Sequence, residues 1–267
     1  MPTLIAEQQG QVVAIANQKG GVGKTTTAIN LGTALAAVER EVLLIDLDPQ
    51  GNASTGLGVA PRARALTTCD ALMGEAPLAD VICATAIPHL ALAPGGDALS
   101  RADHELRDAP DRARRLRVSI DSVKARYDFV LIDCPPALNL LTLNAMAAAD
   151  GVLVPLQCEF FALEGLSQLL STVEQVKRGM NPKLSIQGVL LTMFDRRNNL
   201  SQQVADDVRA TLGELVYATV IPRNVRLSEA PSHALPALIY DHGCAGSQAY
   251  LRLAGEVLRR APRAAAA

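Results

Sequence analysis

The chain has 267 residues, 49% of them hydrophobic and 19% charged, which suits one large α/β domain and is short for two. A net charge of −2 excludes a generally basic nucleic-acid-binding protein, although nine arginines face six acidic residues from Arg196 onward, a local excess of +3. The five cysteines are odd in number and lack a C-x-x-C spacing, which argues against a disulfide framework or zinc site and favours a reducing cytoplasm.

The N-terminal MPTLIAEQQGQ has no basic stretch and no long apolar run, so no signal peptide is expected there. No segment approaches the roughly 20 apolar residues of a membrane span. We therefore expect a cytoplasmic protein.

Short runs of Val, Ile and Leu recur along the chain. They lie at residues 12–15, 42–45, 129–132, 152–154 and 189–191. Their continuous hydrophobicity is typical of strands buried on both faces of a parallel sheet. Helical patterns lie between or after them, at residues 25–38, 111–126, 163–178 and 201–212.

The alternation predicts a doubly wound α/β fold, a mostly parallel sheet with helices on both faces. We expect a single domain over residues 1–260 and a disordered tail over 261–267. Residues 61–110 are less periodic, and we expect a family-specific insertion there.

A glycine-rich segment, QKGGVGKTT, follows the first predicted strand and opens a helical pattern. Glycines allow close backbone approach to a phosphate, and a helix N-terminus supplies N–H donors and a positive dipole. Lys24 can reach the β- and γ-phosphates, and the Thr25 hydroxyl can ligate Mg²⁺. The common G-x-x-x-x-G-K-[ST] pattern is incomplete, because Gln18 occupies its first glycine position. The predicted nucleotide contacts are Lys19, Gly20, Gly21, Val22, Gly23, Lys24, Thr25 and Thr26.

Acidic residues end two of the predicted strands. Asp46 and Asp48 follow the second run, in IDLDPQGN, and Asp133 ends the third, in FVLIDCPP. Carboxylates at these strand ends point into the crevice where open α/β sheets bind ligands. They can serve the Mg²⁺ shell and orient a water for attack on a phosphate. The alternative for the first two is a pair of solvated turn residues before Pro49. We expect Cys134 to be a small buried residue, not a nucleophile.

These motifs together resemble the ParA family of chromosome and plasmid partition ATPases. The segment KGGVGKTT is similar to the deviant Walker A motif of the ParA and MinD group, and the resemblance extends from Val12 to about Val257. It implies a P-loop NTPase that binds ATP and Mg²⁺ and dimerises around two nucleotides. Lys19 would then reach the partner's phosphates and take part in catalysis with Lys24. Asp48 would be tied to hydrolysis, with Asp46, Asp133 and Thr25 near the metal.

Two later segments carry further implications of the resemblance. IPRNVRLSEAPS resembles the family motif that lies on the adenine, which would place Pro222 and Asn224 against the base and favour ATP. LTMFDRRNNL also matches, and partition ATPases use arginines corresponding to Arg197 and Arg226 to bind double-stranded DNA without sequence preference. Ordinary surface arginines are the alternative. The implied partners are a second copy, a ParB-like centromere-binding protein and nucleoid DNA.

The sequence departs from the family at two places. Ala234-Leu235 stands where many relatives carry Gly-Lys, and Val38-Glu39 stands where a glycine usually follows the first helix. The first removes one possible phosphate contact. The second removes a favourable helix cap, at a small local cost.

The sequence leaves three rival functions open. A MinD-like membrane-cycling ATPase would need a bulky apolar C-terminal anchor, whereas residues 251–258 are short of one, so no membrane partner is expected. A small-molecule ligase that phosphorylates a carboxylate would need a substrate pocket beside the γ-phosphate. A ParA-like ATPase could also position another cargo.

Overall fold

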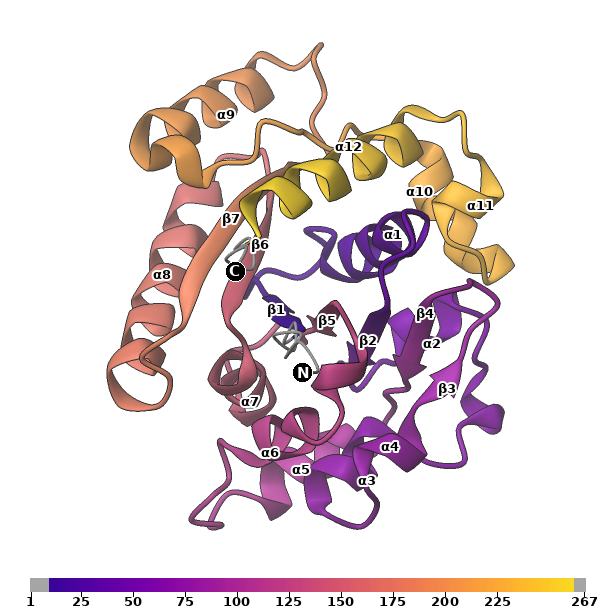
Figure 1. Cartoon of the computed structure of the whole chain (residues 1–267). Coiled ribbons are helices and arrows are strands. Elements are labelled where there is room, and N and C mark those ends of the chain that lie inside the picture. Colours follow the sequence, from indigo (N-terminus) through magenta and orange to yellow (C-terminus); the bar gives the residue numbers. More distant parts are fainter. Residues whose placement is uncertain (1–9, 262–267) are drawn as a thin grey trace, which may run out of the picture.

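The computed structural model of the protein describes residues 10–261, and within them every side chain except that of Asp103. In this range seven strands form one sheet in the order β3-β4-β2-β5-β1-β6-β7 (Figure 1). All neighbouring strands are parallel except β3, which runs antiparallel to β4. The strands are β1 (Gln11–Ile15), β2 (Val42–Asp46), β3 (Cys83–Ala84), β4 (Leu90–Ala93), β5 (Phe129–Asp133), β6 (Gly151–Gln157) and β7 (Ser185–Thr192).

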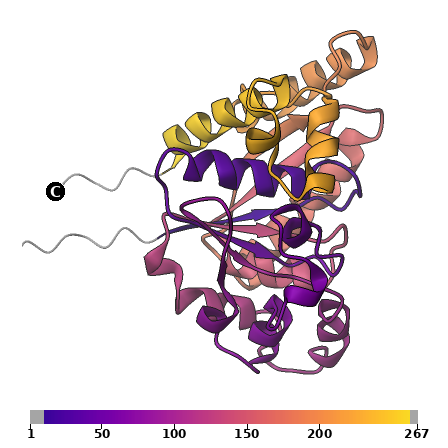
Figure 2. The same cartoon turned by 90° about the vertical axis from the view of Figure 1, so that its right-hand side faces the viewer.

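Helices cover both faces of the sheet, so the protein has three layers (Figures 1 and 2). One face carries α1 and α12, and the other carries α3 to α8. The helices are α1 (Lys24–Ala36), α2 (Asn52–Gly56), α3 (Thr68–Met73), α4 (Leu78–Val81), α5 (Leu99–Glu105), α6 (Arg115–Asp121), α7 (Leu140–Ala148), α8 (Ala162–Gly179), α9 (Asn199–Leu212), α10 (Val225–Glu229), α11 (Ala237–Tyr240) and α12 (Ala245–Arg260). Short 3₁₀ turns are η1 (Pro61–Ala63), η2 (Lys124–Arg126), η3 (Gly213–Leu215) and η4 (Ala230–His233).

The central strands are buried on both faces, as their continuous apolar runs predict. Alternate residues of β1 and β5 enter two separate cores: Val12 and Val130 pack on one side of the sheet, Val13 and Leu131 on the other. The predicted doubly wound, mostly parallel α/β domain is therefore confirmed.

The register of the sheet brings the predicted site to one edge. Ile15 pairs with Asp133 and Asp46 also pairs with Asp133, so β1, β2 and β5 end level with one another. Because the strands are parallel, the loops that follow them leave from the same edge. The glycine-rich loop and both acidic segments therefore meet there.

Residues 61–110 contain the two strands that the sequence did not predict. Strands β3 and β4 lie here, with three short helices around them, and β3 forms one edge of the sheet. The helix predicted over 111–126 is shorter, since only α6 and η2 form in that range. The predicted tail lies, apart from Ala261, outside the described residues.

The missing cap after the first helix has a visible consequence. After α1 the chain turns at Glu39, whose φ is 59°, in the left-handed region that favours glycine. The turn still forms, with Arg40 N donating to Leu35 O at 3.2 Å. A non-glycine residue in this conformation costs about 1–2 kcal/mol, which agrees with the small local cost expected.

Candidate functional site

The glycine-rich loop joins β1 to the first turn of α1. Gly21 and Gly23 have φ angles of 74° and 91°, which explains why glycine is needed at both positions. A Cβ added at Gly20 or Gly21 would meet nothing within 4 Å, so the outer surface of the loop is open. The hydroxyl of Thr192, at the end of β7, donates a hydrogen bond to Val22 O at 2.8 Å and so holds the loop in place. The loop therefore has the open backbone surface that phosphate binding requires.

The two lysines of this loop lie in different environments. Lys24 is 6% exposed, and its ammonium donates to Lys19 O at 2.9 Å across the loop. Burial lowers the pKa of Lys24, whereas the carboxylate of Asp133 raises it. The Lys19 side chain is 45% exposed and forms an ion pair with Glu159, two residues after the end of β6. Lys24 is thus directed inward, while Lys19 lies at the surface and is free to exchange partners.

Asp46 and Asp48 lie side by side but make different contacts. Asp46 is fully buried and accepts hydrogen bonds from Ser54 N at 2.8 Å, Ser54 Oγ at 2.6 Å and Asp48 N at 3.2 Å. Burial raises the pKa of Asp46, and the Ser54 hydrogen bonds oppose that rise. Asp48 is 7% exposed, and one of its oxygens accepts from Gln50 N at 3.0 Å. Neither aspartate is the solvated turn residue of the alternative interpretation.

Asp133 is fully buried, and neither of its oxygens has a hydrogen-bond partner among the described residues. The Thr25 hydroxyl is near enough to lower its pKa but does not reach hydrogen-bond geometry. Burial raises the pKa of Asp133 well above its usual range, and the charge of Asp46 raises it further. Unpaired buried carboxylates are costly, so this side chain indicates a site for a cation.

The residues present fit Mg²⁺. Within residues 10–261 no three His, Cys, Asp or Glu side chains form a complete metal cage. Mg²⁺ does not need one, because it keeps several waters and is held by one or two protein groups together with substrate phosphates. The free oxygens of Asp133 and the Thr25 hydroxyl supply such a partial set, whereas Asp46 already accepts three hydrogen bonds. Cys134 is fully buried and burial raises its pKa, so it is the packing residue expected.

The segment predicted to lie on the base is held beside the end of β7. Pro222 and Phe194 form an isolated parallel β-bridge, and Arg223 N donates a hydrogen bond to Phe194 O at 3.0 Å. Asn224 caps α10, its side-chain oxygen accepting from Arg226 N at 3.0 Å. The side-chain oxygen of Asn224 is thus already engaged in a hydrogen bond within the fold.

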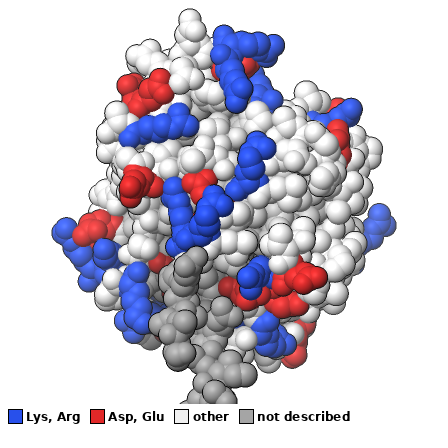
Figure 3. Space-filling model, turned by 45° about the horizontal axis from the view of Figure 1, so that its top comes forward, with Lys and Arg blue, Asp and Glu red and all other residues white. Residues whose placement is uncertain are grey.

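The two arginines predicted to bind DNA are both paired with acidic residues. Arg197 is 89% exposed and binds Asp195 through Nε and Nη2 at 3.0 and 2.9 Å. Arg226 contacts Glu229 at 2.8 Å and Asp241 at 3.3 Å. On the face that carries α9 and α12, Lys and Arg side chains are scattered among uncharged and acidic ones and form no single basic patch (Figure 3).

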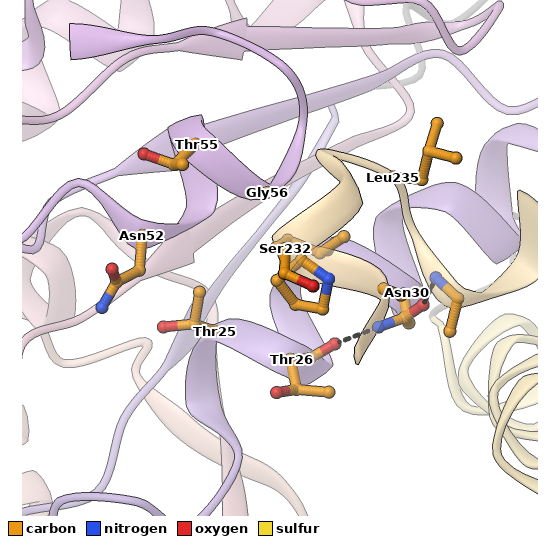
Figure 4. Close-up of a pocket in the computed structure, with 12 residues that line it drawn as sticks. Thr25, Thr26, Asn30, Asn52, Thr55, Gly56, Ser232 and Leu235 are labelled. Atoms are coloured by element: carbon orange, nitrogen blue, oxygen red, sulfur yellow. Dashed lines mark hydrogen bonds between the residues drawn. The ribbon is translucent and has the colours of Figure 1, made fainter. Parts of the chain in front are cut away.

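A cavity of about 410 Å³ opens beside the first turn of α1. Asn52 and Thr55 of α2 lie across it from Leu235, with Thr25 and Thr26 at its floor (Figure 4). Asn30 joins two parts of the cavity lining, because its side chain donates to Thr26 O at 2.8 Å and accepts from Ala237 N at 2.9 Å. None of the lining residues is charged.

Comparisons with known proteins fit this geometry. A family profile described as an AAA domain matches residues 10–186. The chromosome partitioning protein ParA of Caulobacter vibrioides is 62% identical over 252 residues, which are 94% of each chain. The chain belongs to the ParA family of partition ATPases. The sporulation initiation inhibitor protein Soj of Bacillus subtilis is 50% identical, over 93% of this chain and 98% of Soj.

Solved structures extend the ParA-family assignment. A crystal structure of cobyrinic acid a,c-diamide synthase from Mycobacterium smegmatis with bound ADP and magnesium has a TM-score of 0.82 and 37% identity, over 94% of both chains. The cell division ATPase MinD of Pyrococcus furiosus has a TM-score of 0.79 and 30% identity, over 94% of this chain and 99% of MinD. The fold and the family make this ParA-family chain an ATPase. Across residues 10–261, none of the helices has the length and apolar character to cross a membrane.

Three structural partners of the site were not found from the sequence. Ser54 holds Asp46, Thr192 holds the glycine-rich loop, and Glu159 pairs with Lys19. Ser54 lies only eight residues after Asp46, so a hydroxyl at this position was a weak indication of a hydrogen bond to the aspartate. The other two act across 170 and 140 residues of sequence, and no local pattern indicates them.

Proposed function

We propose that this ATPase is a dimerising switch for chromosome or plasmid partition. ATP binds at the loop of residues 19–26, and Lys24 contacts the phosphates. Lys19 leaves Glu159 and reaches the nucleotide of a second copy, so that ATP favours a dimer. The observation that carries the proposal is the meeting of three features at the ends of the paired strands β1 and β5: an open glycine loop, an inward lysine, and an acid with no hydrogen-bond partner within residues 10–261.

Hydrolysis is assigned to the carboxylate at the rim of this site. Asp48 orients a water for in-line attack on the γ-phosphate, because it is the acid on the open side of the buried pair. Asp133 and Thr25 would hold Mg²⁺, and Asp46, which pairs with Asp133 on the neighbouring strand, would lie near it. When bound, Mg²⁺ neutralises charge on the phosphate oxygens. Pro222 and Asn224 contact the adenine.

The ATP-bound dimer binds double-stranded DNA without sequence preference through Arg197 and Arg226. Guanidinium groups pair well with phosphates, and two copies double the number of contacts. A ParB-like partner stimulates hydrolysis, the dimer separates and the DNA is released. The protein is accordingly cytoplasmic and associated with the nucleoid.

The rival functions fit less well. In a MinD-like protein the C-terminal helix would offer an apolar face to a membrane, whereas Tyr250, Leu253 and Val257 of α12 are buried in the core. A ligase acting on a carboxylate would need a substrate pocket beside the γ-phosphate, and the cavity beside Thr25 is lined by uncharged residues, so it offers no cation to hold a substrate carboxylate. A ParA-like positioner of another cargo would share the same chemistry and differ only in its partner protein.

The proposal is tested by Asp48→Ala. The phosphate loop is intact in this variant, so we expect ATP binding, dimerisation and DNA binding to persist while hydrolysis is lost. Nucleotide turnover and DNA co-sedimentation are measured on the same preparation, with no metabolite added and with a ParB-like protein where one is available. A wild-type hydrolysis rate would reject the role of Asp48. Loss of DNA binding together with a normal dimer would reject the DNA-binding switch.

A further inference from the structure

Arg64, directly after η1, is a half-buried cation with no carboxylate partner among the described side chains. Its guanidinium instead donates hydrogen bonds to three backbone oxygens and one hydroxyl group. Nη1 donates to Gly95 O at 2.8 Å, and Nη2 donates to Gly51 O at 3.1 Å and to the Thr55 hydroxyl at 2.8 Å. Nε and Nη2 both donate to Val59 O, at 3.1 and 2.9 Å. An arginine with these partners joins separate segments of the backbone and is not simply a charged surface residue.

Two of these acceptors belong to the segment that carries Asp48. Gly51 N donates to Asp48 O at 2.9 Å and so closes the turn of residues 48–51. Gly51 O accepts from Arg64 and from both the amide and the hydroxyl of Thr55, each at 3.1 Å. Gly51 has a φ of 62°, and a Cβ there would collide with the guanidinium of Arg64. The arginine thus lies directly against the turn.

The same guanidinium joins this turn to the loop after β4. Gly95 N donates to Ser54 Oγ at 3.0 Å, and Ser54 in turn donates to the buried Asp46. Arg64 therefore holds α2 from one side, while Asp46 holds it from the other. This support matters because α2 has only five residues, and a helix of that length is not stable by itself.

We propose that Arg64 is a positioning residue for ATP hydrolysis. By donating hydrogen bonds to both Gly51 O and Gly95 O, Arg64 fixes the turn of residues 48–51. The direction of the Asp48 carboxylate is fixed with it. The planar fork of arginine suits two carbonyls at once, which a lysine cannot reproduce. The inference rests on the proposed role of Asp48, and it adds a residue outside every motif of the family resemblance.

The test uses the full chain with Arg64→Ala and Arg64→Lys. Misplacing a reacting group by about 1 Å can lower a rate roughly 100-fold. We therefore expect kcat to fall about 10- to 100-fold in both variants, with KM and the binding of a fluorescent ATP analogue nearly unchanged. Added guanidinium ion should restore part of kcat in Arg64→Ala. The matched control is Arg62→Ala, because Arg62 lies two residues away, is exposed and has no hydrogen bond or ion pair within residues 10–261.

The combined variant Arg64→Ala/Asp48→Ala separates this inference from the proposed function. If Arg64 acts through Asp48, guanidinium rescues the single variant and not the double one. A wild-type kcat in Arg64→Ala, or equal losses of kcat, analogue binding and thermal stability, would overturn the positioning role. Normal hydrolysis in Asp48→Ala would instead overturn the role of Asp48. If Arg64→Ala does not fold, Arg64→Lys decides, because a wild-type kcat in that variant contradicts the need for the fork.

Discussion

The proposed DNA-binding face makes a quantitative prediction for Arg226→Ala. Four arginine–phosphate contacts in a dimer, two from each copy, give a slope of log K against log salt of about −3 to −4, because each neutralised phosphate contributes roughly 0.9. Removing Arg226 from both copies should reduce the slope by about two units and weaken binding equally on unrelated sequences.

The ion pairs of Arg226 with Glu229 and Asp241 refine this expectation. Exposed ion pairs contribute only about 0–1 kcal/mol, so a phosphate can replace these carboxylates at little cost. The acids nevertheless oppose DNA by their own charge. Glu229→Gln should therefore bind DNA more tightly than the wild type, the opposite of the effect of Arg226→Ala.

The assay is a salt titration of DNA binding with a non-hydrolysable ATP analogue. Arg178→Ala is the matched control: Arg178 is 79% exposed, is also paired with a glutamate, and lies at the end of α8, away from the edge of the sheet that carries the site. An unchanged slope in Arg226→Ala, or equal binding by the nucleotide-free protein, would refute the dimer-built DNA face. If Arg178→Ala lowered the slope by the same amount, the effect of Arg226→Ala would be explained by the change in net charge and not by a phosphate contact.

Three further predictions concern nucleotide binding, dimerisation and stability. Lys24→Ala removes the inward ammonium and should weaken binding of a fluorescent ATP analogue by roughly 2–5 kcal/mol; wild-type binding would reject the site. Lys19→Ala should bind nucleotide as a stable monomer, since its exposed pair with Glu159 contributes only about 0–1 kcal/mol, yet light scattering should detect no ATP-dependent dimer. Glu256 is nearly buried, and although burial alone raises its pKa, hydrogen bonds from Ala218 N and Thr219 N outweigh that effect and lower the pKa below 4.5. Its stabilisation is therefore present above pH 4.5 and lost as the pH falls through the lowered value. Glu256→Gln should lose about 1–3 kcal/mol at neutral pH and show a weaker acid dependence in urea titrations, and an unchanged acid dependence would contradict this reasoning.

Strands β1, β2, β5, β6 and β7 could be predicted because each is a run of β-branched and leucine residues bounded by polar turns. Strands β3 and β4, which lie together at one side of the sheet, could not be predicted, for a physical reason. Cys83–Ala84 is only two residues long, and half of Leu90–Ala93 is alanine, so neither has a strand pattern of its own. Both form because β2 presents an open edge to β4, which is a property of the folded sheet.

The partners of the predicted site residues divide in the same way. Glu229 lies three residues after Arg226 on one helix turn, so that ion pair follows from helical spacing. Asp241 reaches Arg226 only because α11 follows η4 back towards α10, and Glu159 reaches Lys19 only because β6 lies beside β1. Spacing within an element can be read from sequence, whereas contacts between elements depend on the packing.

Asp46 and Asp133 illustrate what the packing adds to a correct motif. In sequence they are equivalent: each ends a run of buried apolar residues, and the sheet pairs them side by side. Yet α2 turns Ser54 onto Asp46 and satisfies it with two strong hydrogen bonds, while no donor in the described part of the chain reaches Asp133. Two neighbouring carboxylates cannot both remain charged and unpartnered in a buried site without a large cost. The fold therefore supplies donors to one acid and leaves the other for a ligand, and it is this division, not the presence of two aspartates, that makes Asp133 the place where a cation is needed.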